Sequence, residues 1–424
     1  MRQHCEYISG AANTVASSIC WTQFQHLHTD FIEIIAYCID NLVAIVDVSK
    51  SVVTETLRGH TGRINVLKAT KSLLISASED STIRVWKISE SLRWVEDSVL
   101  SGVMRSSIIA LSCLDTSSGI LIAASDVTGR LVLWLKGHQS DVFTVLQIID
   151  MPPAQMPHDL HLTEVPGNVP HDSRNAPDIL LFIGSVDTRI HMRIASQQSM
   201  RSVLSDCGET NRKELKYPAG PQSTCSSIFN LVGVLAGHEE WVTCLASMRA
   251  DNRTLLLASG SKDTKIRLWR VVFTPRTSIA SCTESFTNDF NRFNIHMNEN
   301  EEEEEDDEDD GTDNKEGIIE LEPDESLSEA RLMFNTPCGK MECSIFLDAL
   351  LIGHEDWVTS VHWMTSHSCS DSDINSSSSS GSRSGSVSNA PSGEVLRSEN
   401  TMNQDESYRL YSTCMDRYVH IYTY

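Results

Sequence analysis

Short apolar alternations separated by polar turns run through most of the chain. The clearest stretch, residues 237–270, opens with Gly-His and contains two short alternating apolar segments. It closes on Asp263-x-x-Ile266-x-Leu268-Trp269, in which Ile266 and Leu268 point to one face, as the period of two in a strand requires. The stretch predicts a small antiparallel sheet of about four strands.

Polar residues of this stretch are spaced so that they can form hydrogen bonds with one another. Buried polar groups must find partners in the loop that enters the inner strand and in the tight turn between the second and third strands. His238 falls in the first place and Asp263 in the second. We predict hydrogen bonds that link Asp263, His238, Ser259 and the indole N–H of Trp269. Hydrolases also use His, Asp and Ser, but the set recurs here in one frame between strands, which favours a structural tetrad.

The same set recurs along the chain, in two further copies and in three partial ones. The two copies comprise His60, Ser76, Asp80 and Trp86, and His354, Ser412, Asp416 and Tyr422. The partial copies end on Val46 after Asp40, on Trp134 after Thr128 in place of Asp, and on Arg193 after Asp187. Such recurrence is typical of WD repeats and predicts an all-β WD40 β-propeller.

Spacing of the repeats predicts six recognisable blades of a seven-bladed ring that is incomplete at the C-terminal end, behind an N-terminal arm at 1–13. The expected blades are about 14–58, 61–101, 104–136, 139–236, 239–352 and 355–424, within one propeller at 14–424. Four stretches without strand character are expected to be insertions: 151–178, 195–227, 273–343 (acidic, expected to be disordered) and 367–404 (Ser-rich).

The third blade is the irregular one. Only Leu135 and Lys136 separate Trp134 from the next Gly-His, which is too short for a turn and an outer strand of about five residues. The sequence therefore predicts a third blade that is short of a strand, or a lost segment. It also predicts that 142–149 form the inner strand of the fourth blade.

Net charge and cysteine content exclude several functions. The chain has 424 residues and a net charge of −24, and removing Glu299 and the run 301–310 still leaves −13. A phosphate-binding surface is therefore disfavoured for the chain as a whole, and we expect no direct nucleic-acid binding. The twelve cysteines form no CxxC pair, so Cys38, Cys244 and Cys414 are expected to pack in strands as free thiols.

Candidate metal ligands and targeting signals are weak. His26 and His28 are expected in a solvated turn, and His158, His161 and His171 in a loop without a cysteine partner. No metal, cofactor or catalytic residue is predicted. No signal peptide and no uncharged 18-residue apolar run is evident, so a reducing intracellular compartment without membrane association is the expectation.

One face of the ring is expected to dock a partner. All four insertions follow the first or the third strand of a blade and so project from one face, leaving short loops on the other. On that second face, acidic residues precede a tryptophan in two neighbouring repeats, which suits a basic partner; the alternative is that each indole folds over the next blade. The candidate docking residues are Glu239, Glu240, Trp241, Glu355, Asp356 and Trp357.

Several segments resemble subunit 2 of the Elongator complex. They are GHEEWV at 237–242, GHEDWVTSVHW at 353–363, DTRIH at 187–191 with ASQQ at 195–198, and the long insertion ahead of residue 353. The resemblance covers about residues 14–424. It implies a non-catalytic scaffold with two seven-bladed propellers in tandem, which binds the radical-SAM and acetyltransferase subunit 3 and the scaffold subunit 1 in a complex that modifies wobble uridine in tRNA.

The leading interpretation is thus a scaffold subunit of Elongator that is expected in the cytoplasm, with the nucleus as an additional location. The second interpretation is an unrelated WD40 adaptor, such as a ubiquitin-ligase substrate receptor or a histone-binding protein that uses the acidic run. An enzyme has no support, because the sequence contains no Gly-rich phosphate loop and no Ser/His/Asp set outside the repeats.

Overall fold

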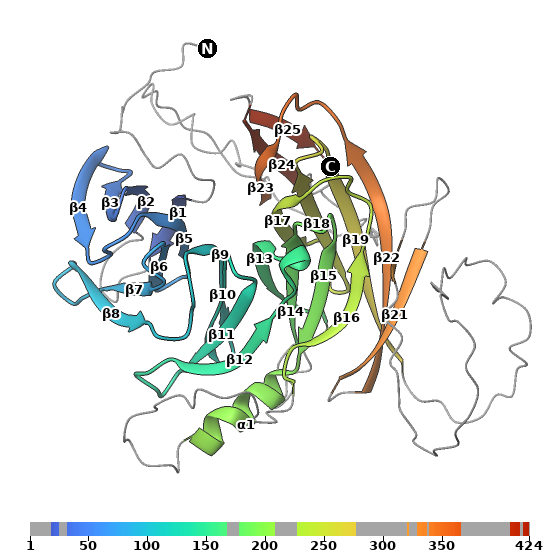
Figure 1. Ribbon diagram of the computed structural model, residues 1–424, viewed down its shortest axis with the longest axis horizontal. Helices are drawn as coiled ribbons and strands as arrows, with labels where there is room; N and C mark the ends of the chain where they lie inside the picture. Colours follow the sequence, from blue (N-terminus) through green and yellow to red (C-terminus); the bar gives the residue numbers. More distant parts are fainter. Residues whose placement is uncertain are drawn as a thin grey trace, which may run out of the picture.

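A computed structural model describes residues 18–24, 32–167, 178–207, 227–276, 320–321, 329–336, 339–365, 408–415 and 419–423. In these ranges the strands form six sheets, which follow one another around a central axis in chain order (Figure 1). The first strand of each sheet lies nearest the axis, and neighbouring inner strands contact one another. The prediction of an all-β propeller with six blades is confirmed.

The first three blades each have four strands that pair in chain order or its reverse. Blade one contains β1 (Ile19–Phe24), β2 (Ile32–Ile39), β3 (Leu42–Asp47) and β4 (Val52–Arg58). Blade two contains β5 (Ile64–Ala69), β6 (Leu73–Ser78), β7 (Ile83–Ile88) and β8 (Trp94–Leu100). Blade three contains β9 (Ile108–Thr116), β10 (Gly119–Asp126), β11 (Arg130–Gly137) and β12 (Thr144–Asp150).

The other blades depart from four strands. Blade four contains β13 (Pro157–Glu164), β14 (Ile179–Ser185), β15 (Ile190–Ala195), β16 (Asn230–Leu235) and the short parallel β20 (Glu320–Leu321). Blade five contains β17 (Val242–Arg249), β18 (Thr254–Ser261), β19 (Ile266–Arg276), β22 (Gly339–Leu351) and β21 (Glu329–Thr336). Blade six shows β23 (Val358–Thr365), β24 (Tyr408–Cys414) and β25 (Val419–Thr423) in the described residues.

Apolar side chains pack between the sheets rather than in one central core. One cluster joins blades four and five and contains Phe182, Leu257 and Trp269, all buried. Comparable clusters join blades one and two, two and three, three and four, and five and six. Each sheet therefore needs its neighbours to bury both faces, as in other repeat architectures.

The approach of blades five and six requires a glycine. A Cβ atom at Gly260 in β18 would lie 2.6 Å from the Sγ atom of Cys244 and 2.6 Å from the Cγ1 atom of Val358. Real Cβ atoms do not come this close to other heavy atoms, so a larger residue would push the blades apart.

A shared irregularity identifies equivalent positions in different blades. The ladder between the third and fourth strands shifts register immediately before the residue in the tryptophan place, which is Trp86, Trp134 and Trp269 in three blades. The same shift precedes Val46 in blade one and Arg193 in blade four. The two partial repeats are therefore aligned as the sequence predicted, although neither has an aromatic residue.

The predicted boundary between blades three and four, with blades at 104–136 and 139–236, was wrong. Residues 144–150 are β12, the outer strand of blade three, which pairs with β11 and buries Leu146. Blade three thus has four strands, because β11 runs on to Gly137 and residues 138–143 make the connection. The inner strand of blade four is β13, in which Leu160 and Leu162 alternate as buried residues.

Three predicted insertions contain regular structure in their described parts. Stretch 151–178 holds a 3-10 turn at Pro153–Gln155 and β13, so His158 and His161 lie in a strand and not in a loop. Stretch 195–227 begins with α1 (Gln197–Cys207), and 273–343 includes the end of β19, β21 and the start of β22. Several predicted features lie outside the described residues: 1–13, His26, His28, His171, the acidic run, the whole of 367–404 and Asp416.

Candidate functional site

The His-Asp-Ser-Trp set of blade five joins three strands by side chains. His238 Nδ1 donates to Asp263 Oδ2 over 2.8 Å, Ser259 Oγ lies 2.8 Å from His238 Nε2, and the Trp269 indole N–H donates to Ser259 Oγ over 3.0 Å. Because the serine oxygen accepts from the indole, its own proton is directed to the imidazole. A neutral histidine satisfies the whole chain of donors and acceptors.

Blade two repeats this geometry. His60 Nδ1 lies 2.9 Å from Asp80 Oδ2, His60 Nε2 lies 2.9 Å from Ser76 Oγ, and Trp86 donates to Ser76 Oγ over 3.0 Å. The aspartate also accepts the backbone N–H of Thr61 over 2.9 Å. The polar set therefore ties the incoming loop to the turn between the second and third strands.

Blade six shows the part of its set that is described. His354 Nε2 lies 2.7 Å from Ser412 Oγ, and Tyr422 occupies the aromatic place in β25, where it packs against the cluster between blades five and six. The contacts of Asp416 fall outside the described residues.

Blades three and four use other residues for the same task. In blade three the turn carboxylate is the fully buried Asp126, which accepts the backbone N–H groups of Thr128 and of Arg105, both over 2.9 Å. Thr128 therefore stands in the place of the turn aspartate, as predicted, and Asp126 supplies the carboxylate from the position where the other blades have Ser78, Ser185 or Ser261. In blade four Asp187 Oδ2 accepts from His191 Nε2 within β15 over 2.8 Å.

Burial and hydrogen bonding move the pKa values of the tetrad groups. Burial lowers the pKa of His60 and of His238, and the aspartate partners only partly oppose it. Burial opposes ionisation of Asp80 and Asp263, but hydrogen bonds to each carboxylate outweigh it and hold its pKa well below the usual range. At neutral pH the pairs are a neutral imidazole and a carboxylate.

These shifts predict a loss of stability on acidification. The unfolded histidines take up a proton near pH 6.5 and the folded ones do not, so the unfolded chain binds more protons and stability falls as the pH drops below about 6.5. The two aspartates add a further loss below about pH 4, toward their lower folded pKa values. Urea denaturation between about pH 7.5 and pH 5 measures the first loss. In a variant carrying His60→Gln and His238→Gln, this loss of stability between about pH 7.5 and pH 5 should be smaller. An unchanged loss would contradict the claim that both imidazoles are neutral in the folded protein.

Two exposed tryptophans follow the tetrad histidines on the face with the short loops. Trp241 and Trp357 stand three residues after His238 and His354, and their exposed fractions are 37% and 43%. The backbone N–H of Lys262 donates to Trp241 O over 3.0 Å, and that of Met415 donates to Trp357 O over 3.1 Å. Hydrogen bonds to the adjacent turns therefore hold both loops in place.

A lysine brings the two indoles together. The Nζ atom of Lys262 lies 3.2 Å from the ring centroid of Trp241 and 3.9 Å from that of Trp357. Both distances are within the range of a cation–π contact. We call Trp241, Lys262 and Trp357 the Trp–Lys–Trp cluster.

Acidic residues flank the cluster. Glu239 pairs with Lys265 over 2.6 Å, and Asp356 Oδ1 accepts the backbone N–H of Trp357 over 2.7 Å. Glu239, Glu240, Glu355 and Asp356 are all exposed. The structure thus brings Trp241 and Trp357 of the predicted docking surface together at Lys262, and its four acidic residues lie on the loops next to these indoles. The sequence prediction missed Lys262, although its place next to the turn residue Asp263 puts it on the face of the Gly-His loops.

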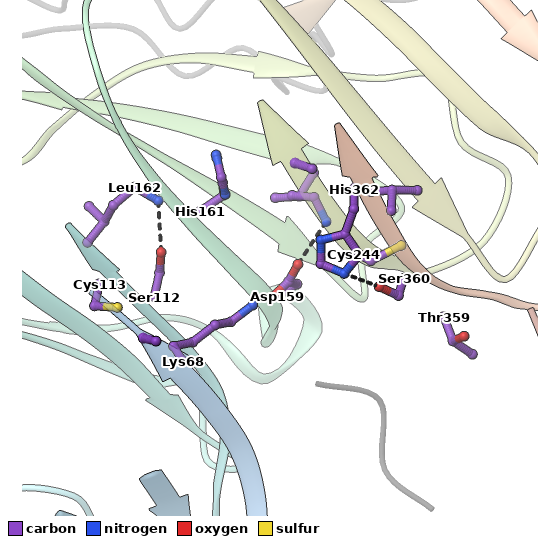
Figure 2. Close-up of a pocket in the computed structure, with 14 residues that line it drawn as sticks. Lys68, Ser112, Cys113, Asp159, His161, Leu162, Cys244, Thr359, Ser360 and His362 are labelled. Carbon is purple, nitrogen blue, oxygen red and sulfur yellow. Dashed lines mark hydrogen bonds between the residues drawn. The ribbon is translucent and has the colours of Figure 1, made fainter. Parts of the chain in front are cut away.

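A second candidate site is a cavity of about 190 Å³ on the propeller axis, lined by β5, β9, β13, β17 and β23 (Figure 2). Asp159 Oδ2 accepts the backbone N–H of Leu245 over 2.7 Å, and His161 Nε2 accepts that of Ser247 over 3.1 Å. Burial raises the pKa of Asp159 and lowers that of His161 to about 4. Lys68 reaches into the same space (Figure 2).

Thiols in the axial cavity are poorly suited to nucleophilic chemistry. Burial raises the pKa of Cys113 to about 12 and raises that of Cys244 further, so both stay protonated at neutral pH. Cys38, Cys244 and Cys414 are buried in strands as thiols and form no disulfide, as predicted. Among the described residues no group of three His, Cys, Asp or Glu side chains is arranged to hold a metal ion. No helix in these residues is long and apolar enough to span a membrane.

Fold and repeats together define a WD-repeat β-propeller protein. The family model described as "WD domain, G-beta repeat" matches residues 51–87 and 229–270, which include the tetrads of blades two and five. Most of the chain is similar to Elongator complex protein 2. The chain is 26% identical to that protein from Dictyostelium discoideum, over 84% of this chain and 37% of the relative.

Two fungal relatives give the same result. Elongator complex protein 2 of Schizosaccharomyces pombe is 24% identical over 77% of this chain and 33% of its own length. Elongator complex protein 2 of Saccharomyces cerevisiae is 24% identical over 73% of this chain and 30% of its own length. The chain thus spans about a third of the length of the curated relatives it matches.

Proposed function

We propose that this chain is a non-catalytic WD-repeat scaffold subunit of the Elongator complex. In this role it docks the catalytic subunit 3 and the scaffold subunit 1, and so supports modification of wobble uridine in tRNA. The proposed location is the cytoplasm, with the nucleus as an additional one. Similarity to Elongator complex protein 2 along most of the chain supports the proposal.

The observation that carries the docking role is the Trp–Lys–Trp cluster with its acidic border. Large aromatic side chains that stay partly exposed are enriched at the energetic centres of protein interfaces. Here two of them lie together on backbone loops that the tetrads hold in place. Acidic residues around them favour a partner with a basic surface and steer its approach.

Binding of purified subunits tests the proposal. The tagged 424-residue chain is mixed with purified subunits 1 and 3, and the retained proteins are quantified. We expect both subunits to be retained, and retention of neither would overturn the proposal. A variant without residues 299–310 tests the alternative of an adaptor that binds histones through the acidic run. Loss of histone binding with subunit binding unchanged would favour that second function.

A further inference from the structure

The ammonium group of Lys262 is held by aromatic rings and not by a carboxylate. Its Nζ atom contacts the Trp241 and Trp357 rings, and no carboxylate of the described residues lies within ion-pair distance of it. The neighbouring Lys265 behaves differently, because it forms an ion pair with Glu239 over 2.6 Å. Lys262 can therefore leave the rings without breaking an ion pair to a described residue.

The two rings are arranged before any partner binds. Lys262 and Trp241 belong to blade five and Trp357 begins blade six, so the cluster bridges two blades. His158 at the start of β13 also packs near Trp241, with 6.1 Å between the ring centroids. A receptor whose aromatic walls are already in place loses little conformational entropy when a cation enters.

The surroundings favour a positive charge at this place. Glu239, Glu240, Glu355 and Asp356 are all exposed on the loops that carry the two indoles. Burial lowers the pKa of Lys262, and Glu240 opposes that shift. Since both indoles remain partly exposed, a cation from outside can reach the space that Lys262 occupies.

We propose that Trp241 and Trp357 form a receptor for an arginine or lysine side chain of a partner protein, and that Lys262 fills the receptor until the partner displaces it. The inference rests on the proposed function only in taking this face as a docking surface. Lys262 acts as an internal competitor, so its removal strengthens binding of a basic segment instead of weakening it.

Peptide binding to the purified chain tests the competition. The probe is a fluorescein-labelled (Arg-Ser)4 peptide, and the same peptide with citrulline for arginine keeps the shape but lacks the charge. We expect Lys262→Ala to lower the Kd of the arginine peptide about tenfold, the equivalent of one displaced cation–π contact. The citrulline peptide should show no such gain.

Lys265→Ala is the matched control, because it removes one positive charge from the same turn without touching the rings. We expect it to change the Kd less than about threefold, as for an exposed ion pair. Adding Trp241→Ala to Lys262→Ala should abolish the gain. An equal gain from Lys265→Ala, a gain that survives without Trp241, or no gain from Lys262→Ala would each overturn the receptor.

These outcomes are separable from failure of the proposed function. Suppose that the unaltered chain retains subunits 1 and 3 but Lys262→Ala has no effect on peptide binding. The scaffold role would then stand, and the proposed receptor for a basic side chain would be wrong. If Lys262→Ala binds the peptide about tenfold more tightly but the chain retains neither subunit, the proposed receptor would stand and the proposed role in Elongator would be wrong.

Discussion

Replacing Trp269 with alanine will lower the free energy of unfolding by about 3–5 kcal/mol, the usual cost of removing a buried tryptophan side chain. The indole is 4% exposed and packs in the cluster between blades four and five. Its loss opens a cavity and also leaves Ser259 without the donor that fixes the direction of the hydrogen bonds to His238. Asp263→Ala removes a carboxylate that accepts from His238, from Arg267 and from two backbone N–H groups, and it should cost less, about 1–3 kcal/mol.

Urea denaturation of the purified variants measures these losses. Trp21→Ala is the matched control, since Trp21 lies in a strand but is 58% exposed, and its indole N–H donates to the half-buried Glu33. It should cost less than about 1 kcal/mol. Equal losses for Trp269→Ala and Trp21→Ala would mean that the tetrad does not stabilise its blade.

Replacing Trp241 and Trp357 together with alanine will weaken binding of the Elongator subunits by about 30-fold or more. Central aromatic residues of an interface each cost about 2 kcal/mol or more on truncation, and a factor of ten corresponds to about 1.4 kcal/mol. Stability should change by less than about 1 kcal/mol, because both side chains are exposed and lie outside the clusters between blades.

Surface plasmon resonance with immobilised subunits 1 and 3 gives the Kd values, and Trp21→Ala again serves as the control. Unchanged affinity in the double variant would place the docking surface elsewhere. A loss of affinity accompanied by a large loss of stability would instead show that the two indoles hold blades five and six together.

Fold class and blade number could be predicted from the sequence because the repeat is defined by local constraints. A Gly-His loop, a turn carboxylate and an aromatic residue fix three strands in each complete copy, and Trp86 and Trp269 lie where their repeats place them. Even Val46 and Arg193 align, since the backbone irregularity before each is a property of the blade and not of the side chain.

The strand boundaries of blade three could not be predicted, because its Gly-His and its turn carboxylate do not stand where the other repeats have them. The Gly-His at 137–138 resembles a blade entrance, but Gly137 ends β11 and pairs with Gly119 of β10. Thr128 takes the place of the turn aspartate, and Asp126, two residues before it, supplies the carboxylate. Long-range pairing, and not the local motif, decides which strand follows.

The candidate site was only partly visible in the sequence. Proximity to the histidines identified Trp241 and Trp357, because the loops after Gly-His belong to one face. Lys262 was missed, since contact between its ammonium group and two rings depends on the angle between neighbouring blades. The axial cavity was missed for the same reason, as its lining comes from five inner strands far apart in the chain.

Hydrogen–deuterium exchange of the chain, alone and with subunits 1 and 3, is the most direct test of the docking face. We expect slower exchange on binding in peptides that cover 237–243, 260–265 and 353–359, which surround the Trp–Lys–Trp cluster. Protection confined to other blades, or to α1, with these three peptides unchanged would contradict it.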